Sequence, residues 1–253
     1  MQTRRQLSFA ASLLLVVGLA WLVSRDVLNP ESPPIPRFLA ADLPSDCCQV
    51  LLVLSPNAPS IHAHAWMLER ARTSDAWRPL RGPLLVTLGR NGLAWGVGEH
   101  SSPPPTDFPI KREGDGCSPA GIFRIPFAFG IPPSTDASWI KLPYTHLTQD
   151  IIGIDDPKSQ YYNQVLNART VERDWDSDER MNRHQKVYRW GAFIAHNPEA
   201  TPGGGSCIFL HLWPGPGRST AGCTAMSEND LVQILQWLDP SRNPRLIQAL
   251  ESW

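Results

Sequence analysis

Short apolar runs separated by turn-forming residues dominate the 253-residue chain. Residues 49–54 form an almost continuous apolar run, which is typical of a buried strand. Proline (25 residues) and glycine (18 residues) are spread along the whole chain, as expected for short strands joined by many turns. The pattern therefore predicts a mainly β fold. Further strands are expected at residues 65–69, 77–80, 84–88, 121–129 and 208–213.

One helix is clearly marked, close to the C-terminus. Ser227 and Asp230 have the S-x-x-D form of a helix N-cap. Apolar residues then recur at helical spacing from Leu231 to Leu238, and Pro240 ends the run. We expect the apolar side of this helix to pack on the sheet.

Residues 155–188 break the alternation of strands and turns. This stretch is polar and has no clear period. We therefore expect a long irregular insertion, and loops of this size are commonly functional. Within it, the run Asp176 to Arg180 is expected to be a solvated charge cluster.

The N-terminus has the pattern of an export segment. Arg4 and Arg5 precede residues 7–23, which carry no charge. The positive-inside rule then places the rest of the chain across the membrane. No clean cleavage site precedes Arg25, so residues 1–28 are either a cleaved signal peptide or a retained anchor. Residues 29–46 are expected to be a proline-rich spacer, which is extended over residues 29–36, and residues 47–253 are expected to be the catalytic domain.

Composition narrows the classes of partner. A hydrophobic content of 42% with 19% charged residues indicates an ordinary globular protein. A net charge of −1 means that the chain has no excess of positive charge with which to bind the phosphates of nucleic acid. An exported protein with five cysteines leaves one unpaired if the others form disulfides. One disulfide, two or none all remain open. The oligomeric state also remains open.

His211 and Cys223 suggest nucleophilic chemistry. His211 lies in an apolar run, and the Pro-Gly turn at 214–217 can bring Cys223 back beside it. A cysteine attacks as the thiolate, so it needs a base such as an imidazole nearby. Gly222 lets a carbonyl substrate approach closely.

Two other interpretations fit the same residues. His211 could be a hydrogen-bonded core residue and Cys223 an inert or disulfide-bonded thiol. Alternatively His196, Cys207, His211 and Cys223 could bind zinc, although the usual short paired spacings are missing.

Four segments resemble the L,D-transpeptidase catalytic domain (YkuD-like) family. FLHLWPGPGRSTAGCTAM is similar to its active-site segment and KREGDGCSPAGIF to an upstream motif. GRNGLAWG and DDPKSQYYN also resemble one exported branch, so the likeness extends from about residue 49 to 238. The resemblance implies a β-sandwich-like fold with a few short helices. It also implies a protein of the periplasm or cell envelope.

The resemblance assigns roles to four residues. Cys223 matches the nucleophile and His211 the general base, while Thr220 and Gly222 match conserved motif positions. The implied reaction is a transfer between peptidoglycan stem peptides through a thioester, without any cofactor or metal. Hydrolysis by the same cysteine, as an L,D-carboxypeptidase or amidase, is the alternative.

Two positions depart from the family pattern. Ala221 stands where most members have histidine, and Ala225 stands where many have an arginine that holds an anionic substrate group. These changes leave open a protein that binds peptidoglycan without catalysis. Five further residues are candidates for substrate binding, although packing roles explain them too: His196, Asn197, Tyr161, Tyr162 and Trp213.

Overall fold

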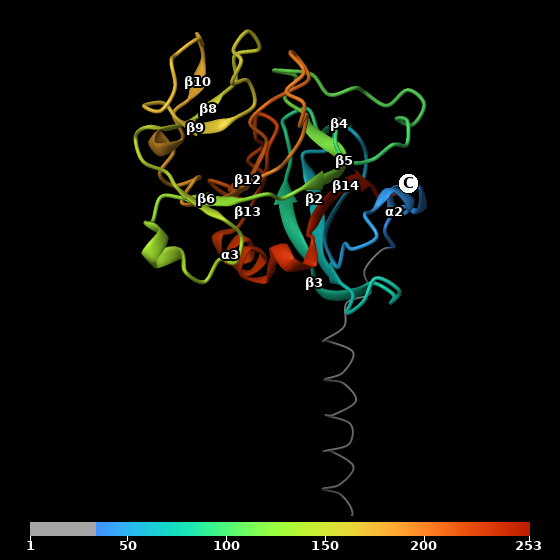
Figure 1. Cartoon of the computed structure of the whole chain (residues 1–253). Coiled ribbons are helices and arrows are strands. Elements are labelled where there is room, and N and C mark those ends of the chain that lie inside the picture. Colours follow the sequence, from blue (N-terminus) through green and yellow to red (C-terminus); the bar gives the residue numbers. More distant parts are fainter. Residues whose placement is uncertain (1–33) are drawn as a thin grey trace, which may run out of the picture.

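The computed structural model describes residues 34–253, and the predicted export segment lies outside this range. The described residues form an eleven-stranded sheet and a separate three-stranded sheet (Figure 1). The mainly β prediction is therefore confirmed. The large sheet has the order β4-β5-β14-β1-β2-β3-β13-β12-β11-β6-β7, and the small sheet the order β10-β8-β9.

The strand bounds are β1 (Gln49–Ser55), β2 (His62–Glu69), β3 (Arg78–Thr87), β4 (Leu93–Trp95), β5 (Ser118–Arg124), β6 (Ala128–Gly130), β7 (Tyr144–His146), β8 (Ile151–Ile154), β9 (Val165–Asn167), β10 (Asp178–Glu179), β11 (Trp190–Phe193), β12 (Phe209–Leu212), β13 (Thr224–Met226) and β14 (Arg245–Leu250). The α-helices are α2 (Arg37–Asp42) and α3 (Glu228–Trp237). Short 3-10 helices lie at Ser134–Ala137, Met181–Arg183 and Pro240–Arg242.

Strand β1 forms the centre of the large sheet. Every residue of β1 is buried, as its apolar run predicts. It pairs in parallel with β14 and antiparallel with β2. The main hydrophobic core extends from this strand to the inner side of α3.

Two strand predictions need correction. The runs 77–80 and 84–88 belong to a single strand, β3, because both pair continuously with β2 apart from local bulges. The run 121–129 is instead divided between β5 and β6. Pro126 lies in the gap, and proline has no N–H to donate to a sheet ladder.

The insertion is more ordered than its sequence suggests. Strands β9 and β10 lie within residues 155–188 and pair with β8 to form the small sheet. Ile152, Ile154 and Trp175 are buried together beneath it. Figure 1 shows this small sheet to one side of the large one.

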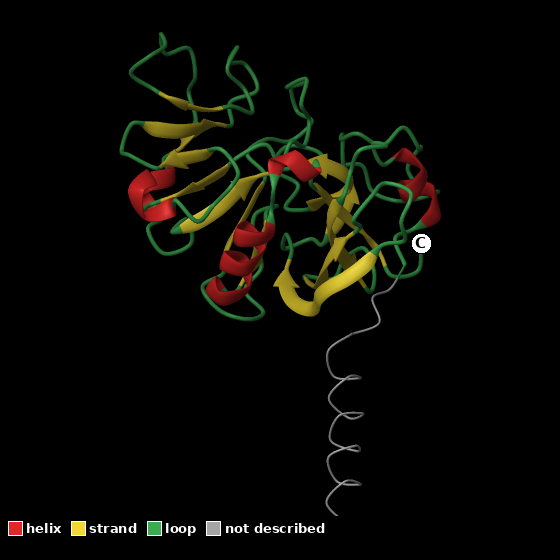
Figure 2. Cartoon of the chain, turned by 60° about the horizontal axis from the view of Figure 1, so that its bottom comes forward, coloured by secondary structure: helices red, strands yellow, loops and turns green. Residues whose placement is uncertain are grey.

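Helix α3 forms where the sequence predicts it. The side chain of Ser227 caps the helix by accepting a hydrogen bond from the Asp230 N–H at 3.1 Å. Leu231, Ile234 and Leu235 are buried where α3 packs on β11 and β12 (Figure 2).

The predicted spacer contains helix α2. Residues 29–46 are expected to be a spacer that precedes the folded domain, yet residues 37–42 are helical and Leu39 is fully buried in the main core. Leu39 has apolar neighbours on other elements, and such packing outweighs the local preference set by nearby prolines. Within residues 34–253, no helix combines the length and the hydrophobicity that crossing a membrane requires.

Candidate active site

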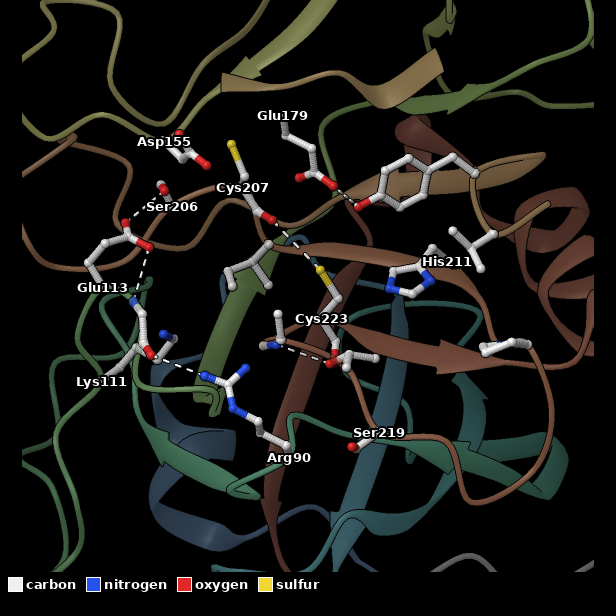
Figure 3. Close-up of a pocket in the computed structure, with 18 residues that line it drawn as sticks. Arg90, Lys111, Glu113, Asp155, Glu179, Ser206, Cys207, His211, Ser219 and Cys223 are labelled. Atoms are coloured by element: carbon white, nitrogen blue, oxygen red, sulfur yellow. Dashed lines mark hydrogen bonds between the residues drawn. The ribbon is translucent and has the colours of Figure 1, made fainter. Parts of the chain in front are cut away.

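Strands β12 and β13 bring His211 and Cys223 into one pocket. The two strands run in parallel, His211 lies opposite Ala225 in the register, and Cys223 directly precedes β13. Residues 213–223 form the crossover between them. Both side chains line a pocket of about 420 Å³, and Figure 3 shows them beside each other.

The Cys223 thiol is buried and held by backbone groups. Its Sγ accepts a hydrogen bond from the Phe209 N–H at 3.3 Å and donates to the Cys207 carbonyl at 3.7 Å. All five cysteines are free thiols, so no disulfide blocks this sulfur. Burial, with a smaller contribution from the Glu179 carboxylate, raises the pKa of Cys223 to about 12. The group is therefore a neutral thiol at pH 7.

The His211 imidazole is buried and has a defined tautomer. Its Nδ1 lies 2.9 Å from the Leu212 carbonyl oxygen, which can only accept a hydrogen bond. Nδ1 therefore carries the proton and Nε2 keeps its lone pair. Burial lowers the pKa of His211 to about 4, so the ring is neutral at pH 7. Within residues 34–253, no hydrogen bond joins the imidazole to the Cys223 thiol.

Thr220 and Ser118 fix the backbone of Cys223. The Thr220 hydroxyl donates to the Cys223 carbonyl at 2.6 Å and accepts from the Gly222 N–H at 3.1 Å. The Ser118 hydroxyl donates to the same carbonyl at 2.9 Å. A Cβ on Gly222 would lie 3.1 Å from the Cys117 carbonyl oxygen at a φ of +155°. This turn therefore requires glycine just before the cysteine.

Charged side chains of both signs line the pocket. Arg90 and Lys111 are the cations, and the carboxylates belong to Glu113, Asp155 and Glu179. In Figure 3, Glu179 and Asp155 lie on one side of Cys223 and Arg90 lies on the other. The pocket can therefore hold a ligand that carries separated positive and negative groups.

Lys111 lies in the pocket wall as a buried ion pair. Its Nζ donates to Asp115 Oδ1 and to the Arg112 carbonyl, both at 2.7 Å. The sequence did not single out this lysine for chemistry. Its pairing with Asp115 shapes the turn that carries Glu113 and Gly114 to the pocket rim.

Arg90 reaches the pocket from a loop beside the segment that carries Cys223. Its backbone N–H donates to the Thr220 carbonyl at 2.9 Å, and its guanidinium donates to the Gly114 carbonyl at 3.4 Å. Ala225 is fully buried beside His211 and brings no charge to the site. Ala221 lies on the pocket surface. Arg90 therefore supplies a cation that β13 does not.

Tyr188 and Glu179 are site residues that the sequence did not reveal. The Tyr188 hydroxyl donates to Glu179 Oε1, and its ring meets the His211 ring edge-on at 5.4 Å. Glu179 was expected to be part of a solvated charge cluster, but it is half-buried and lines the pocket. Strand β10 places it there by pairing with β8. The aperiodic sequence of the insertion contains no local signal for this pairing.

His196 and Asn197 lie outside the pocket lining. His196 accepts from the Val97 N–H at 3.2 Å through Nδ1 and donates through Nε2 to the Gly204 carbonyl at 2.9 Å. The Asn197 amide donates to the Gly205 carbonyl at 3.1 Å. Both side chains are buried and hold the turn that leads into β12.

The two candidate tyrosines have different surroundings. The Tyr162 hydroxyl accepts from the Gly205 N–H at 3.2 Å and donates to Glu113, so it supports a pocket residue from behind. Tyr161 instead packs edge-on against Trp175 in the core of the insertion, with ring centroids 6.1 Å apart. Neither ring lines the pocket.

Trp213 lines a second cavity. This cavity of about 880 Å³ adjoins the first, because Pro214 contributes to the wall of both. Pro132, Pro133 and Trp213 form its apolar part. Trp213 therefore lies at a neighbouring cavity and not beside Cys223. Its contact with substrate stays a prediction.

The zinc alternative has no matching geometry. In residues 34–253, no three histidine, cysteine, aspartate or glutamate side chains are grouped as metal ligands would be. His196 is already engaged by two backbone groups away from the pocket. The arrangement around Cys223 instead suits a buried thiol nucleophile with a neutral base beside it.

Comparison with known proteins identifies the family of the chain. The model of the L,D-transpeptidase catalytic domain (YkuD) matches residues 75–247, which is more than half of the chain. Searches of curated proteins and of solved structures returned no significant match. The matched range includes all the pocket residues described above. The chain therefore belongs to the L,D-transpeptidase catalytic domain family.

Proposed function

We propose that this protein is an exported cysteine acyltransferase, an L,D-transpeptidase that crosslinks or remodels peptidoglycan in the cell envelope. The family acts on peptidoglycan stem peptides in general. The observation that carries the proposal is the shared pocket of a free Cys223 thiol and a neutral His211 imidazole with an available Nε2 lone pair. The uncharged run at residues 7–23 supports export, either as a cleaved signal or as a membrane anchor.

The acylation step uses this pair directly. His211 Nε2 takes the thiol proton as Cys223 Sγ attacks the carbonyl of the L-configured centre of a diamino acid in the stem. The terminal D-alanine then leaves with the proton carried by the imidazole, and a thioester remains on Cys223. The Phe209 N–H, 3.3 Å from Sγ, stabilises the sulfur while it is negative. The thiolate, the base and backbone dipoles suffice for this chemistry without a cofactor.

Arg90 is the residue that we assign to the donor carboxylate. In this family an arginine at the position of Ala225 commonly holds an anionic group, and here that position is a buried alanine. The Arg90 side chain lines the same pocket as Cys223, and its guanidinium donates a hydrogen bond to the Gly114 carbonyl. It therefore compensates for the missing charge from another loop.

Intact-mass spectrometry of the purified protein with tetrapeptide stem fragments tests the proposal. We expect a thioester on the wild type, none on Cys223→Ala, and formation slowed by about 100- to 10,000-fold in His211→Ala, as for the loss of a general base. Arg90→Ala should still form the adduct but with a KM raised by about 10-fold, as for the loss of a charge-assisted hydrogen bond.

Cys48→Ala is the matched control, because this thiol is free and does not line the pocket. It should acylate like the wild type. Dimeric products indicate transfer, whereas tripeptide monomers indicate a carboxypeptidase. A wild-type protein that binds peptidoglycan but never carries an acyl group would overturn the proposal in favour of a non-catalytic binding protein.

A further inference from the structure

Glu179 differs from the other pocket carboxylates in its contact with Tyr188, the tyrosine whose ring packs on His211. The Glu113 side chain accepts hydrogen bonds from Ser206 and Tyr162, and Asp155 accepts one from Ser177. Glu179 accepts only from the Tyr188 hydroxyl, through Oε1. Within residues 34–253, its Oε2 has no hydrogen-bond partner and neither oxygen has a cationic partner.

The position of Glu179 relative to the nucleophile is also specific. Figure 3 shows its carboxylate above the Cys223 thiol, on the side of the pocket away from Arg90. Tyr188, which is 5% exposed, holds it there while its own ring packs on His211. One buried tyrosine thus links this carboxylate to the base. This arrangement leaves an anion next to the reacting sulfur, where it cannot assist formation of the thiolate.

Resting on the proposed function, we propose that Glu179, oriented by Tyr188, binds the ammonium group of the acceptor stem peptide and removes its proton before the amine attacks the thioester. A carboxylate beside the nucleophile disfavours the thiolate, so its presence there is explained by a step that follows acylation. An acceptor amine is positively charged in water and must lose a proton to become a nucleophile. Glu179 is the pocket group whose charge and position match this requirement.

The proton balance of the step is complete. Glu179 takes one proton from the acceptor ammonium, and the resulting neutral amine forms a C–N bond with the thioester carbonyl. The C–S bond breaks, the second amine proton passes to His211 Nε2, and the imidazole returns it to the Cys223 sulfur. Glu179 then releases its proton to solvent. No oxidant or further reactant is required.

Burial favours this proton transfer. A buried carboxylate and a buried ammonium both lose hydration, so their neutral forms gain in relative stability. Burial also raises the pKa of Glu179 above its ordinary value. The titratable groups that face it are Tyr188, His184, Asp155, Cys207 and Cys223. The Tyr188 hydroxyl is an inferior base for this step because it must lose its own proton first, and burial raises its pKa well above the usual range.

Separate assays of acylation and transfer test the inference with the Glu179→Gln variant. We expect a thioester formed within about 3-fold of the wild-type rate, because His211 and Cys223 perform that step. Transfer to a second stem peptide should fall by at least about 10-fold, while hydrolysis of the thioester continues, as expected when one general base is lost. Tyr188→Phe keeps the ring on His211 and removes the hydroxyl. It should also lower the ratio of transfer to hydrolysis.

Glu172→Gln is the matched control, since Glu172 is exposed on the same insertion and does not line the pocket. It should leave the ratio of transfer to hydrolysis unchanged. An unchanged ratio in Glu179→Gln, or equal losses of acylation and transfer, would overturn the inference while leaving the proposed function intact. A wild-type protein that acylates but only hydrolyses would overturn it too. Absence of acylation in the wild type would instead remove the proposed function itself, and the inference with it.

Discussion

Burial acts in opposite directions on the two residues at the centre of the site. It raises the pKa of Cys223 to about 12 and lowers that of His211 to about 4, because each group loses hydration in its charged form. The resting pair is therefore uncharged. In the proposed reaction, proton transfer from sulfur to imidazole therefore belongs to the acylation step and does not precede substrate binding.

This state determines how acylation depends on pH. His211 accepts a proton only while it is neutral, so the rate should stay high below pH 6 and fall with a midpoint near its pKa of about 4. Single-turnover acylation measured between pH 3.5 and 8 checks this. Loss of activity centred near pH 6.5, the ordinary histidine value, would show that the imidazole is hydrated when it acts.

Thr220 offers a test of how the nucleophile is positioned. Its hydroxyl donates to the Cys223 carbonyl and accepts from the Gly222 N–H. Thr220→Val keeps the shape but leaves the Gly222 N–H without a partner and the Cys223 carbonyl with Ser118 alone, and we expect acylation to slow by about 10- to 100-fold through misplacement of the sulfur. Loss of the hydrogen bonds should also reduce the free energy of unfolding by about 1 to 3 kcal/mol.

Thr220→Ser retains the hydroxyl and provides the control. Its acylation rate should remain within about 3-fold of the wild type, as expected when the hydrogen bonds survive. Equal rates for the valine and serine variants would mean that Ser118 alone holds the turn, since its hydroxyl donates to the same carbonyl.

At the scale of elements, patterns contained within one segment were predicted correctly. Strand β1 is marked by its continuous apolar run, and helix α3 by its helical spacing of apolar residues and by the capping residue Ser227. Strands β9 and β10 do not, because they are short and gain stability only by pairing with β8. Helix α2 was not predicted either, because its sequence is surrounded by prolines and its stability comes from the burial of Leu39 in the core.

Helix α2 provides a quantitative test at this scale. Leu39 is fully buried, so Leu39→Ala should reduce the free energy of unfolding by about 2 to 5 kcal/mol, the usual range for a buried leucine. Urea denaturation measures this change. Leu80→Ala is the matched control, because Leu80 is 46% exposed and its truncation should cost less than about 0.5 kcal/mol. Similar losses of unfolding free energy in the two variants would show that α2 does not pack against the folded domain.

At the scale of the whole molecule, two buried histidines make stability depend on pH. Burial lowers the pKa values of His196 and His211 to about 4 from an ordinary value of 6.5. The unfolded chain therefore binds more protons between these values. The stability that comes from keeping the rings neutral is present above pH 6.5 and is lost as the pH falls toward 4.

As the pH falls from 7 to 4.5, we expect each of these two histidines to lower the free energy of unfolding by about 2 to 3 kcal/mol. Urea denaturation at the two pH values measures the loss. His196→Gln should reduce the difference between them by about 2 to 3 kcal/mol, since the contribution of that ring is gone. His62→Gln, at an exposed position, should leave the difference unchanged. Equal dependence in all three proteins would contradict this assignment.

The amino-acid sequence by itself determined the mainly β class, the C-terminal helix, the family, and the expectation that His211 and Cys223 meet. These features follow from local periodicity and from one short stretch that contains both residues. Only the tertiary structure decided that Arg90, Glu179 and Tyr188 reach the pocket. It alone also placed His196, Asn197 and Tyr161 outside the pocket. The physical reason is that burial, pKa and proximity depend on pairings between distant segments, and a pattern within one segment carries no information about its neighbours in space.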